Sequence, residues 1–415
     1  MIKSDVIVIG GGFAGLMAAA VSAKRGKKVT LLTYGSGSFP LNSGLIDIMA
    51  RPIDETVCAT PVEGIQALPA QHPYKRVAAN IVEDAVTFFK ELCEEENYPY
   101  SGSLTKHQWV VTALGTMKPT CLVPKTMLGD LCLKKEEIVL VGFNRLKDHY
   151  VNVMEENLQQ SLGKKKNYTT VMVDAGIEDG RDLTALDIAR WLSTTQGYET
   201  CIKQLRSAVK ANSVVILPQV LGLKHDYAIW AQMKKDLQCE ILESTGLPPS
   251  ANGLRLRNLL LNYLKKHNVT MIENAKVIGS TVRNHICTAI TTQAAARERT
   301  YKADNFILAT GGFYGGGLQM ENFPSIKETI FDIPVQFEGE AEEWANEKLF
   351  SNQKQPFAEV GIQTDAKMRP LDGAGNCFIN NVFVVGRNLS GYDFCFEQSG
   401  NGVALVSAYQ AAMSL

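Results

Sequence analysis

The sequence predicts an α/β fold, in which a Rossmann-type domain is interrupted by a second, inserted α/β domain. Three observations lead to this expectation. A glycine-rich turn joins a buried strand to a helix near the N-terminus, strands and helices alternate over residues 137–242, and a Gly-Leu-Pro-Pro break follows at 246–249. Strands that alternate with helices are typical of parallel sheets. We therefore expect a first domain built from residues 1–119 and 247–415, with residues 120–246 inserted as the second domain.

The N-terminal segment has the pattern of one βαβ unit of about thirty residues. A strand is expected at residues 4–9, and its residues 6–9 are apolar without alternation, as in a strand that is buried on both faces. A helix of small and apolar residues is expected from about Phe13 to Arg25, and Gly26 ends it. Residues 28–33 then form the second strand.

The turn between the first strand and the helix carries the spacing Gly10-x-Gly12-x-x-Gly15. The first glycine permits the tight turn, the second lets the backbone approach a phosphate, and the third lets the helix pack on the strand. Free N–H groups at the helix N-terminus favour a diphosphate. We expect this turn to bind the phosphates of a nucleotide cofactor through Gly10, Gly11, Gly12, Phe13, Ala14 and Gly15.

The second strand ends at Thr33, where a dinucleotide-binding unit usually carries an acid that binds the adenosine ribose. The sequence therefore has the turn that binds the phosphates of a nucleotide, but it lacks the acid that would bind an adenosine ribose. Two explanations stay open at this point. Either a hydroxyl group holds the ribose, or the cofactor is a mononucleotide.

Further polar and glycine-rich turns lie where other strands end or helices begin. In a doubly wound sheet the carboxyl ends of the strands converge on one crevice, where glycines let flat rings approach the backbone. Each turn alone is more simply an ordinary turn, but the set together favours a cofactor site. The candidates are Thr33, Ser43, Gly44, Thr310, Gly311, Gly312, Gly386, Arg387, Gly400, Asn401 and Gly402.

Composition excludes several classes of function. A net charge of −1 over 415 residues gives no sign of nucleic-acid or anionic-membrane binding. The nine cysteines are scattered, and neither they nor the six histidines have metal-ligand spacing, so we expect no metal. Residues 6–23 superficially resemble a signal peptide, but basic residues mainly follow them, so we expect a cytoplasmic protein. Residues 331–357 form a charged excursion from the first domain.

Several idiosyncratic segments occur together between Gly10 and the C-terminus. They are 42–47, 72–74, 112–116, 247–250, 253–256, 308–312, 315–317, 361–365, 369–370 and 386–393. On these segments the chain resembles the B subunit family of anaerobic glycerol-3-phosphate dehydrogenases, within the fumarate-reductase-like flavoproteins. Three residues depart from the family pattern: Arg387 and Asn388 stand where small residues are common, and Asn401 interrupts a glycine run.

The resemblance implies a flavin subunit of a quinone-linked dehydrogenase that oxidises sn-glycerol 3-phosphate to dihydroxyacetone phosphate under anaerobic conditions. It further implies FMN as cofactor and two partners, a catalytic A subunit plus an iron–sulfur C subunit that holds the complex at the inner face of the cell membrane. The missing acid at Thr33 fits FMN, and FAD is the alternative. Two rival functions stay open: a non-catalytic flavin subunit for electron transfer or assembly, and a reductase of another small substrate.

Substrate oxidation by a flavin needs a base for the hydroxyl proton, and a phosphorylated substrate needs cationic donors. His72 is the candidate base, and a surface or capping histidine is the alternative. Arg255 is the candidate phosphate ligand, and a solvated or ion-paired helix residue is the alternative. Lys118, Lys125 and Arg387 are weaker candidates.

Overall fold

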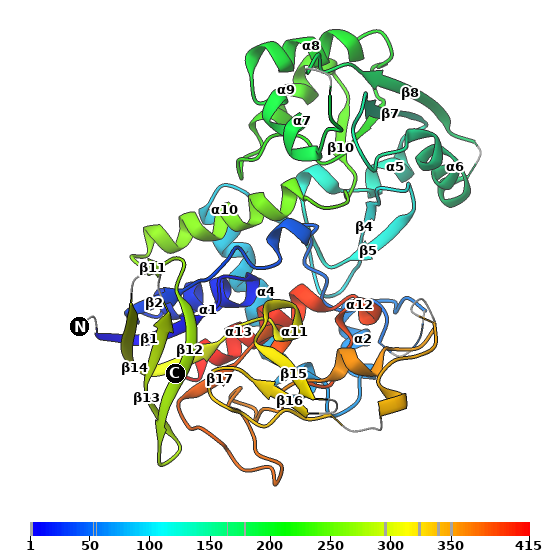
Figure 1. The fold of residues 1–415 in the computed structure, drawn as a ribbon. Helices are drawn as coiled ribbons and strands as arrows, with labels where there is room; N and C mark the ends of the chain where they lie inside the picture. Colours follow the sequence, from blue (N-terminus) through cyan, green and yellow to red (C-terminus); the bar gives the residue numbers. More distant parts are fainter. Residues whose placement is uncertain are drawn as a thin grey trace. The chain divides into compact units, whose positions relative to one another are not determined.

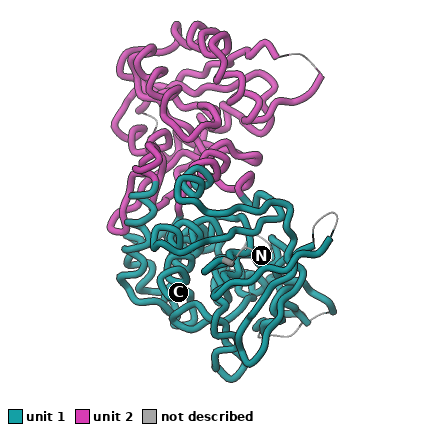
Figure 2. Tube along the Cα trace, turned by 90° about the vertical axis from the view of Figure 1, so that its left-hand side faces the viewer, with its two compact units in different colours: residues 1–38, 47–92, 260–415 teal, residues 39–46, 93–259 magenta. Residues whose placement is uncertain are grey.

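The structure is a computed structural model. It describes residues 3–52, 54, 56–163, 165–177, 180–293, 297–322, 325–337, 341–348 and 352–415. The chain forms two compact units, coloured separately in Figure 2: unit 1 has residues 1–38, 47–92 and 260–415, and unit 2 has residues 39–46 and 93–259. Each unit contains a parallel sheet with helices, which confirms the predicted α/β fold class.

Unit 2 reaches beyond the range 120–246 that the sequence predicts for the inserted domain. The reason is strand pairing: β3 (Tyr100–Gly102) pairs with β6 (Leu122–Pro124), and β4 (Gln108–Val111) pairs with β5 (Met117–Thr120). These ladders hold residues on both sides of position 120 in one unit. Where an independently folding domain begins and ends stays a prediction.

Unit 1 is built on a sheet whose central strands are parallel. From one edge they are β11 (Thr270–Ile272), β2 (Val29–Leu32), β1 (Lys3–Ile9), β14 (Glu298–Leu308) and β17 (Val382–Val384). Residues 6–9 of β1 are all buried, as their unalternating apolar pattern predicts, and so are the four residues of β2. The carboxyl ends of β1, β14 and β17 therefore lie next to one another, and Figure 1 shows these strands in the lower part of the view.

The same sheet continues as an antiparallel meander beyond β14. β12 (Lys276–Arg283) pairs with β13 (Ile286–Gln293), and β13 pairs with the first part of β14. Asn284 and His285 both have positive φ, 48° and 60°, as a tight hairpin turn requires. The sequence predicts one hairpin or meander over residues 270–290, but β11 is a separate strand that joins the parallel part.

Two apolar helices pack against each other in unit 1, α1 (Phe13–Lys24) and α13 (Gly400–Met413). Both consist largely of small or aliphatic side chains, most of them buried, so neither has a continuous polar face. This burial accounts for the uncharged stretches near both ends of the chain. None of the helices within the described ranges is long and apolar enough to cross a bilayer.

Shorter elements complete unit 1. They are α2 (Pro61–Ala67), α3 (Pro73–Arg76), α11 (Gly312–Gly315), α12 (Phe394–Glu397), and the hairpin of β15 (Leu318–Asn322) and β16 (Ser325–Glu328). Two helices contribute to both units, α4 (Ala79–Glu95) and α10 (Ala251–Lys266). The predicted excursion at 331–357 has two short 3-10 helices, and residues 338–340 and 349–351 lie outside the described part.

Unit 2 contains a four-stranded parallel sheet in the order β10 (Glu240–Glu243), β9 (Val214–Leu217), β7 (Glu137–Phe143), β8 (Asn167–Val173). Its helices are α5 (Asp130–Lys134), α6 (Val151–Leu162), α7 (Ala185–Leu192), α8 (Thr195–Leu205) and α9 (Ala228–Leu237). The sequence predicts each of these except α5 and α8.

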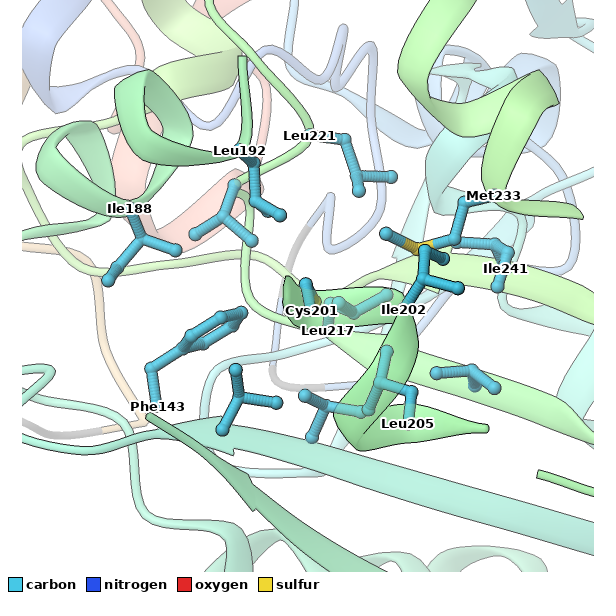
Figure 3. Close-up of a cluster of buried hydrophobic side chains, with 14 of the residues drawn as sticks. Phe143, Ile188, Leu192, Cys201, Ile202, Leu205, Leu217, Leu221, Met233 and Ile241 are labelled. Atoms are coloured by element: carbon cyan, nitrogen blue, oxygen red, sulfur yellow. The ribbon is translucent and has the colours of Figure 1, made fainter. Parts of the chain in front are cut away.

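The sheet of unit 2 is covered by helices on both faces. Val139, Val141 and Phe143 of β7 face a core that α7, α8 and α9 complete, shown in Figure 3. The alternate residues Ile138 and Leu140 face a second core with α6. Because both faces are buried, β7 has the nearly continuous apolar sequence expected of a doubly wound sheet.

Removing a buried leucine from this core is expected to destabilise unit 2. Leu217 of β9 is fully buried, so Leu217→Ala should lower the free energy of unfolding by about 2–5 kcal/mol. Leu133→Ala is the matched control, because Leu133 lies in the same unit but is 56% exposed, and it should cost less than about 1 kcal/mol. Denaturant titration followed by tryptophan fluorescence gives both values, and equal losses would contradict the assigned core.

Candidate functional site

The turn between β1 and α1 lies against the end of β14 so closely that only glycine fits at two positions. Gly10 has a φ of +119°, and a Cβ there would lie 2.2 Å from the carbonyl oxygen of Ala309. A Cβ on Gly15 would lie 1.9 Å from the carbonyl oxygen of Gly10. The first and third glycines of the motif are therefore explained by the protein's own packing, as the motif predicts.

Gly12 differs, because a Cβ on it would meet no protein atom within 4 Å. It is the N-cap residue of α1, and no side chain caps the helix there. Nothing in the described protein requires glycine at this position, while a phosphate at the helix N-terminus would. The loop after β2 lies against the same turn, since a Cβ on Gly37 would lie 2.7 Å from the Cα of Gly12. The space beside Gly12 fits the diphosphate of a nucleotide cofactor.

Two further predicted turns meet this one. A Cβ on Gly386 would lie 2.8 Å from the Cβ of Ala14 at the start of α1. Asn388 then links the turn after β17 to the turn after β14: its Oδ1 accepts hydrogen bonds from Gly312 N (2.8 Å) and Thr310 Oγ1 (3.1 Å). The structure thus brings together the predicted segments 10–15, 310–312 and 386–387.

The glycines at the start of α13 have a packing reason of their own. Gly402 donates its N–H to the carbonyl oxygen of Asp47 (2.9 Å), and a Cβ on it would lie 2.3 Å from the hydroxyl oxygen of Tyr74. α13 also contacts the turn after β17, because Gly386 donates its N–H to Ser407 Oγ (3.0 Å). Contacts of Gly400, Asn401 and Gly402 with a cofactor stay a prediction.

Ser43 and Gly44 belong to unit 2, not to the unit that carries the phosphate turn. A Cβ on Gly44 would lie 2.8 Å from the Cβ of Asn252, so close packing on α10 accounts for this glycine. Thr33 does lie beside the phosphate turn, because a Cβ on Gly11 would lie 2.8 Å from Thr33 Cγ2. The cofactor roles of all three predicted residues stay untested.

A cavity of about 120 Å³ opens in unit 1 around Arg387, the residue that follows Gly386. The guanidinium carbon lies 4.2 Å from the ring centroid of Phe394 and 5.2 Å from that of Tyr314. No carboxylate within the described ranges pairs with Arg387. The cavity is lined by Phe313, Tyr314, Trp344, Phe357, Ala358, Val360, Arg387, Tyr392 and Phe394. A half-buried cation among aromatic rings is a site for an anionic group.

Tyr392 adds an uncharged donor to this cavity. Its side chain is buried, and its hydroxyl has no hydrogen-bond partner in the part of the chain that the structure describes. Burial raises the pKa of Tyr392, so the hydroxyl keeps its proton. Sequence reasoning missed this residue, although it lies within the segment 386–393 that carries the family resemblance.

His72 is fully buried, and both of its ring nitrogens are occupied. Nδ1 accepts a hydrogen bond from Tyr74 N (3.1 Å), which caps α3, and Nε2 lies 3.0 Å from Glu397 Oε2. Burial lowers the pKa of His72, and Lys354 holds the other oxygen of Glu397 at 2.5 Å. This geometry favours the capping role over the role of catalytic base, which stays a prediction.

Arg255 is buried in unit 2 and is held by a carboxylate. Its Nη1 and Nη2 donate to Glu243 at 2.6 and 2.9 Å, and its Nε donates to the carbonyl oxygen of Gly222 at 2.8 Å. A further bond goes to Asn252 Oδ1. The guanidinium has little capacity left for a substrate phosphate, so the geometry favours the ion-paired alternative.

Metal ligands and cysteines form no cluster in the described residues. No group of three or more His, Cys, Asp or Glu side chains there is placed to hold a metal ion. The nine cysteines are free thiols, and only Cys395 is exposed. That the protein uses no metal stays a prediction.

A structural role for Arg255 predicts loss of stability rather than loss of substrate affinity. Arg255→Met leaves Glu243 as an unpaired buried charge and should lower the free energy of unfolding by about 3–5 kcal/mol. The double change Arg255→Met with Glu243→Leu should recover most of that loss. Arg190→Met is the control, because Arg190 is exposed where it pairs with Asp187, and such a pair contributes about 0–1 kcal/mol. A folded Arg255→Met variant that has only a raised KM would support the substrate role instead.

Among solved structures, the chain is similar to the 3-ketosteroid Δ1-dehydrogenase of Sterolibacterium denitrificans in complex with 1,4-androstadiene-3,17-dione. The likeness covers 100% of this chain and 99% of that one, with 11% sequence identity and a TM-score of 0.45.

The sequence matches the family of FAD binding domains over residues 5–403. This match shows a flavoprotein and favours FAD. It does not support the preference for FMN that was based on the missing acid at Thr33. Of the two explanations for that residue, the match favours the one in which another group replaces the acid at the ribose.

Two relatives are both named as the B subunit of anaerobic glycerol-3-phosphate dehydrogenase. The Vibrio cholerae protein is 30% identical, over 99% of this chain and 96% of its own length. The Vibrio vulnificus protein is 28% identical, over 100% of this chain and 97% of its own length. With its phosphate turn, the FAD-binding match and these full-length relatives, the chain belongs to the B subunit family of anaerobic glycerol-3-phosphate dehydrogenases, a family of flavoproteins.

Proposed function

We propose that this protein is the FAD-carrying subunit of a quinone-linked dehydrogenase that oxidises sn-glycerol 3-phosphate to dihydroxyacetone phosphate. The observation that carries the proposal is the Arg387 guanidinium, which pairs with no carboxylate of the described residues and lies in a cavity that adjoins the turns at 310–312 and 386–388. Arg387 follows Gly386, which contacts Ala14 of the phosphate turn, so an anion on Arg387 would lie close to the cofactor-binding edge of the sheet.

The cofactor would be held by the turns that converge at this edge. Backbone N–H groups at the start of α1 would bind the diphosphate, and the turns at 310–312 and 386–388 would lie against the remainder of the flavin. A bound flavin supplies the acceptor for the hydride that leaves the hydroxyl-bearing carbon of the substrate.

The substrate would be oriented by two side chains of the cavity. Arg387 would bind the phosphate through its planar fork of donors, and the Tyr392 hydroxyl would donate to a substrate oxygen. The aromatic walls exclude water and strengthen both interactions. The cavity thus provides recognition of an anionic substrate.

A second candidate function is supported by what lines the cavity. Among the described lining residues none carries a carboxylate or an imidazole, so none is a ready base for the hydroxyl proton. This favours a flavin subunit that relays electrons while a separate partner chain oxidises the substrate. Reduction of the bound flavin by glycerol 3-phosphate in this chain alone separates the two candidates, because only a substrate-oxidising subunit would bleach.

We also propose the partners and location that such a protein requires. A separate catalytic chain would share the oxidation of the substrate, and an iron–sulfur chain would accept the electrons and pass them to quinone. The iron–sulfur chain would also hold the complex at the cytoplasmic face of the membrane. The relatives are named as one subunit among several, which supports an assembly of more than one kind of chain.

The open space at Gly12 predicts loss of cofactor when a side chain fills it. Gly12→Val should fold and lose most of its bound flavin, because the valine would occupy the phosphate position beside the helix N-terminus. Gly279→Val is the matched control. A Cβ on Gly279 also meets no atom within 4 Å, but this residue lies in β12 and not in the turn. Flavin absorbance per polypeptide after purification is the measurement, and chromatography of the released cofactor identifies it as FAD or FMN. Full flavin content in Gly12→Val would contradict the assignment of this turn.

The position of the Arg387 guanidinium in the cavity predicts a specific kinetic defect. Arg387→Met should reduce kcat/KM for glycerol 3-phosphate in the assembled complex about tenfold to a hundredfold, since a charged hydrogen bond contributes about 1.5–3 kcal/mol. Flavin content should stay unchanged. Arg283→Met, an exposed arginine on β12, is the control and should behave as the unaltered protein. Unchanged kinetics in Arg387→Met would remove this cavity as the substrate site.

A further inference from the structure

The strand order of unit 2 predicts where a ligand of that unit would bind. The chain runs from β7 outward to β8, then returns past β7 to β9 and β10. The connection that follows β7 therefore leads towards one edge of the sheet, and the connection that follows β9 leads towards the opposite edge. In doubly wound sheets, ligands bind in the crevice at this switch point. The topology alone places a candidate crevice between the loops that follow β7 and β9.

A cavity of about 40 Å³ lies at this place. Its walls come from residues 146–149 after β7, Pro218 and Gln219 after β9, residues 246–249 after β10, and Thr184 and Ala185 at the start of α7. All of these residues belong to unit 2. The strand order and the cavity are independent observations, and both place the candidate site between the loops that follow β7 and β9.

Gln219 carries an unsatisfied donor in this cavity. Its side chain is fully buried, and its Oε1 accepts from Ser250 Oγ (2.9 Å) and Asn252 N (3.1 Å). These two donors fix which end of the amide is the oxygen. The Nε2 group then has no partner within the described part of the chain, which is unfavourable for a buried donor. A Cβ on Gly246 would lie 2.4 Å from Nε2, so glycine leaves the room that the amide needs.

The charged groups that line the cavity favour a ligand that has both an anionic group and a hydroxyl group. Lys147 is exposed at the cavity wall, and no carboxylate in the described residues pairs with it. His149 donates Nε2–H to the carbonyl oxygen of Val141 (3.1 Å), and burial lowers its pKa, so it stays neutral. Asp148 is the one acid among the described lining residues and offers an acceptor for a hydroxyl group.

The cavity size and the loop sequence limit the ligand to a small one. About 40 Å³ holds a group of a few non-hydrogen atoms, given that one water needs about 10–15 Å³. The loop after β7, residues 144–150, contains no glycine, so its backbone does not offer a diphosphate the close approach that a glycine-rich turn allows. Side-chain donors would have to hold the ligand.

We propose that unit 2 has a second binding site, at the cavity between Lys147 and Gln219, for the phosphate or carboxylate group of a small metabolite. Lys147 supplies the charge and the Gln219 amide supplies the buried donor. This site is separate from the flavin turns and from the Arg387 cavity, and it does not depend on the function proposed for them.

The test uses the full-length, flavin-loaded protein with inorganic phosphate and acetate as probes. Phosphorus NMR line broadening reports phosphate binding, and proton saturation-transfer NMR reports acetate binding. The dissociation constant for the bound anion should rise at least tenfold in Lys147→Met and in Gln219→Glu, which keeps the acceptor for Ser250 but replaces the donor by a carboxylate. Lys203→Met, an exposed lysine on α8, should leave it unchanged. Arg387→Met is measured beside these variants, because the cavity around Arg387 is proposed to bind a phosphate as well.

Each result decides the proposal. Binding of phosphate that depends on Lys147 and Gln219 supports a phosphate ligand, and the same dependence for acetate alone supports a carboxylate ligand. Absence of saturable binding for both anions overturns the proposal, as does binding that only Arg387→Met weakens. If Gln219→Glu does not fold, Lys147→Met decides alone, because Lys147 is exposed and its replacement does not disturb the core.

Discussion

Three backbone turns touch one another at the carboxyl ends of β1, β14 and β17, and this contact needs positions without side chains. Gly10 and Gly386 would each place a Cβ within 3 Å of a neighbouring turn or helix, and a Cβ on Gly15 would lie within 3 Å of the Gly10 carbonyl oxygen in the same turn. Asn388 then holds the second and third turns together with its amide. Because the turns are locked in this way, the start of α1 stays open beside Gly12, and Arg387 is carried to the wall of the cavity. The open space beside Gly12 and the cavity around Arg387 both depend on this close approach.

In this protein, the structural and the functional candidates differ in one respect. A structural polar side chain already has its hydrogen-bond or ion-pair partners within the chain. His72 and Arg255 looked catalytic in the sequence, but Glu397 and Glu243 occupy them, and breaking such a pair would leave an uncompensated buried charge. Arg387, Tyr392 and Gln219 are the opposite case, with donors that the described chain leaves unused. Protein interiors rarely leave buried donors unsatisfied, so such groups point to a ligand or to water.

In both units the proposed ligand site lies at the carboxyl ends of parallel strands, but different groups would bind the ligand. In unit 1 a glycine-rich turn at the end of β1 leaves open space beside Gly12, where backbone N–H groups would bind a phosphate. In unit 2 the loop after β7 has no glycine, and Lys147 and Gln219 present side-chain donors at the equivalent edge. The first arrangement suits an extended cofactor that must lie flat along the backbone. The second suits a small group that a few side chains can surround.

The sequence by itself determined the βαβ unit, the phosphate turn and the family, because strand burial, helix composition and the glycine spacing are local properties. It also located most strands and helices of unit 2 from apolar runs. It could not place β11 apart from the β12–β13 hairpin, or join residues 93–119 to unit 2, because both depend on pairing with strands distant in the sequence. Only the tertiary structure decided which polar residues are free, since Glu243 and Glu397 reach Arg255 and His72 through folding, not through sequence proximity.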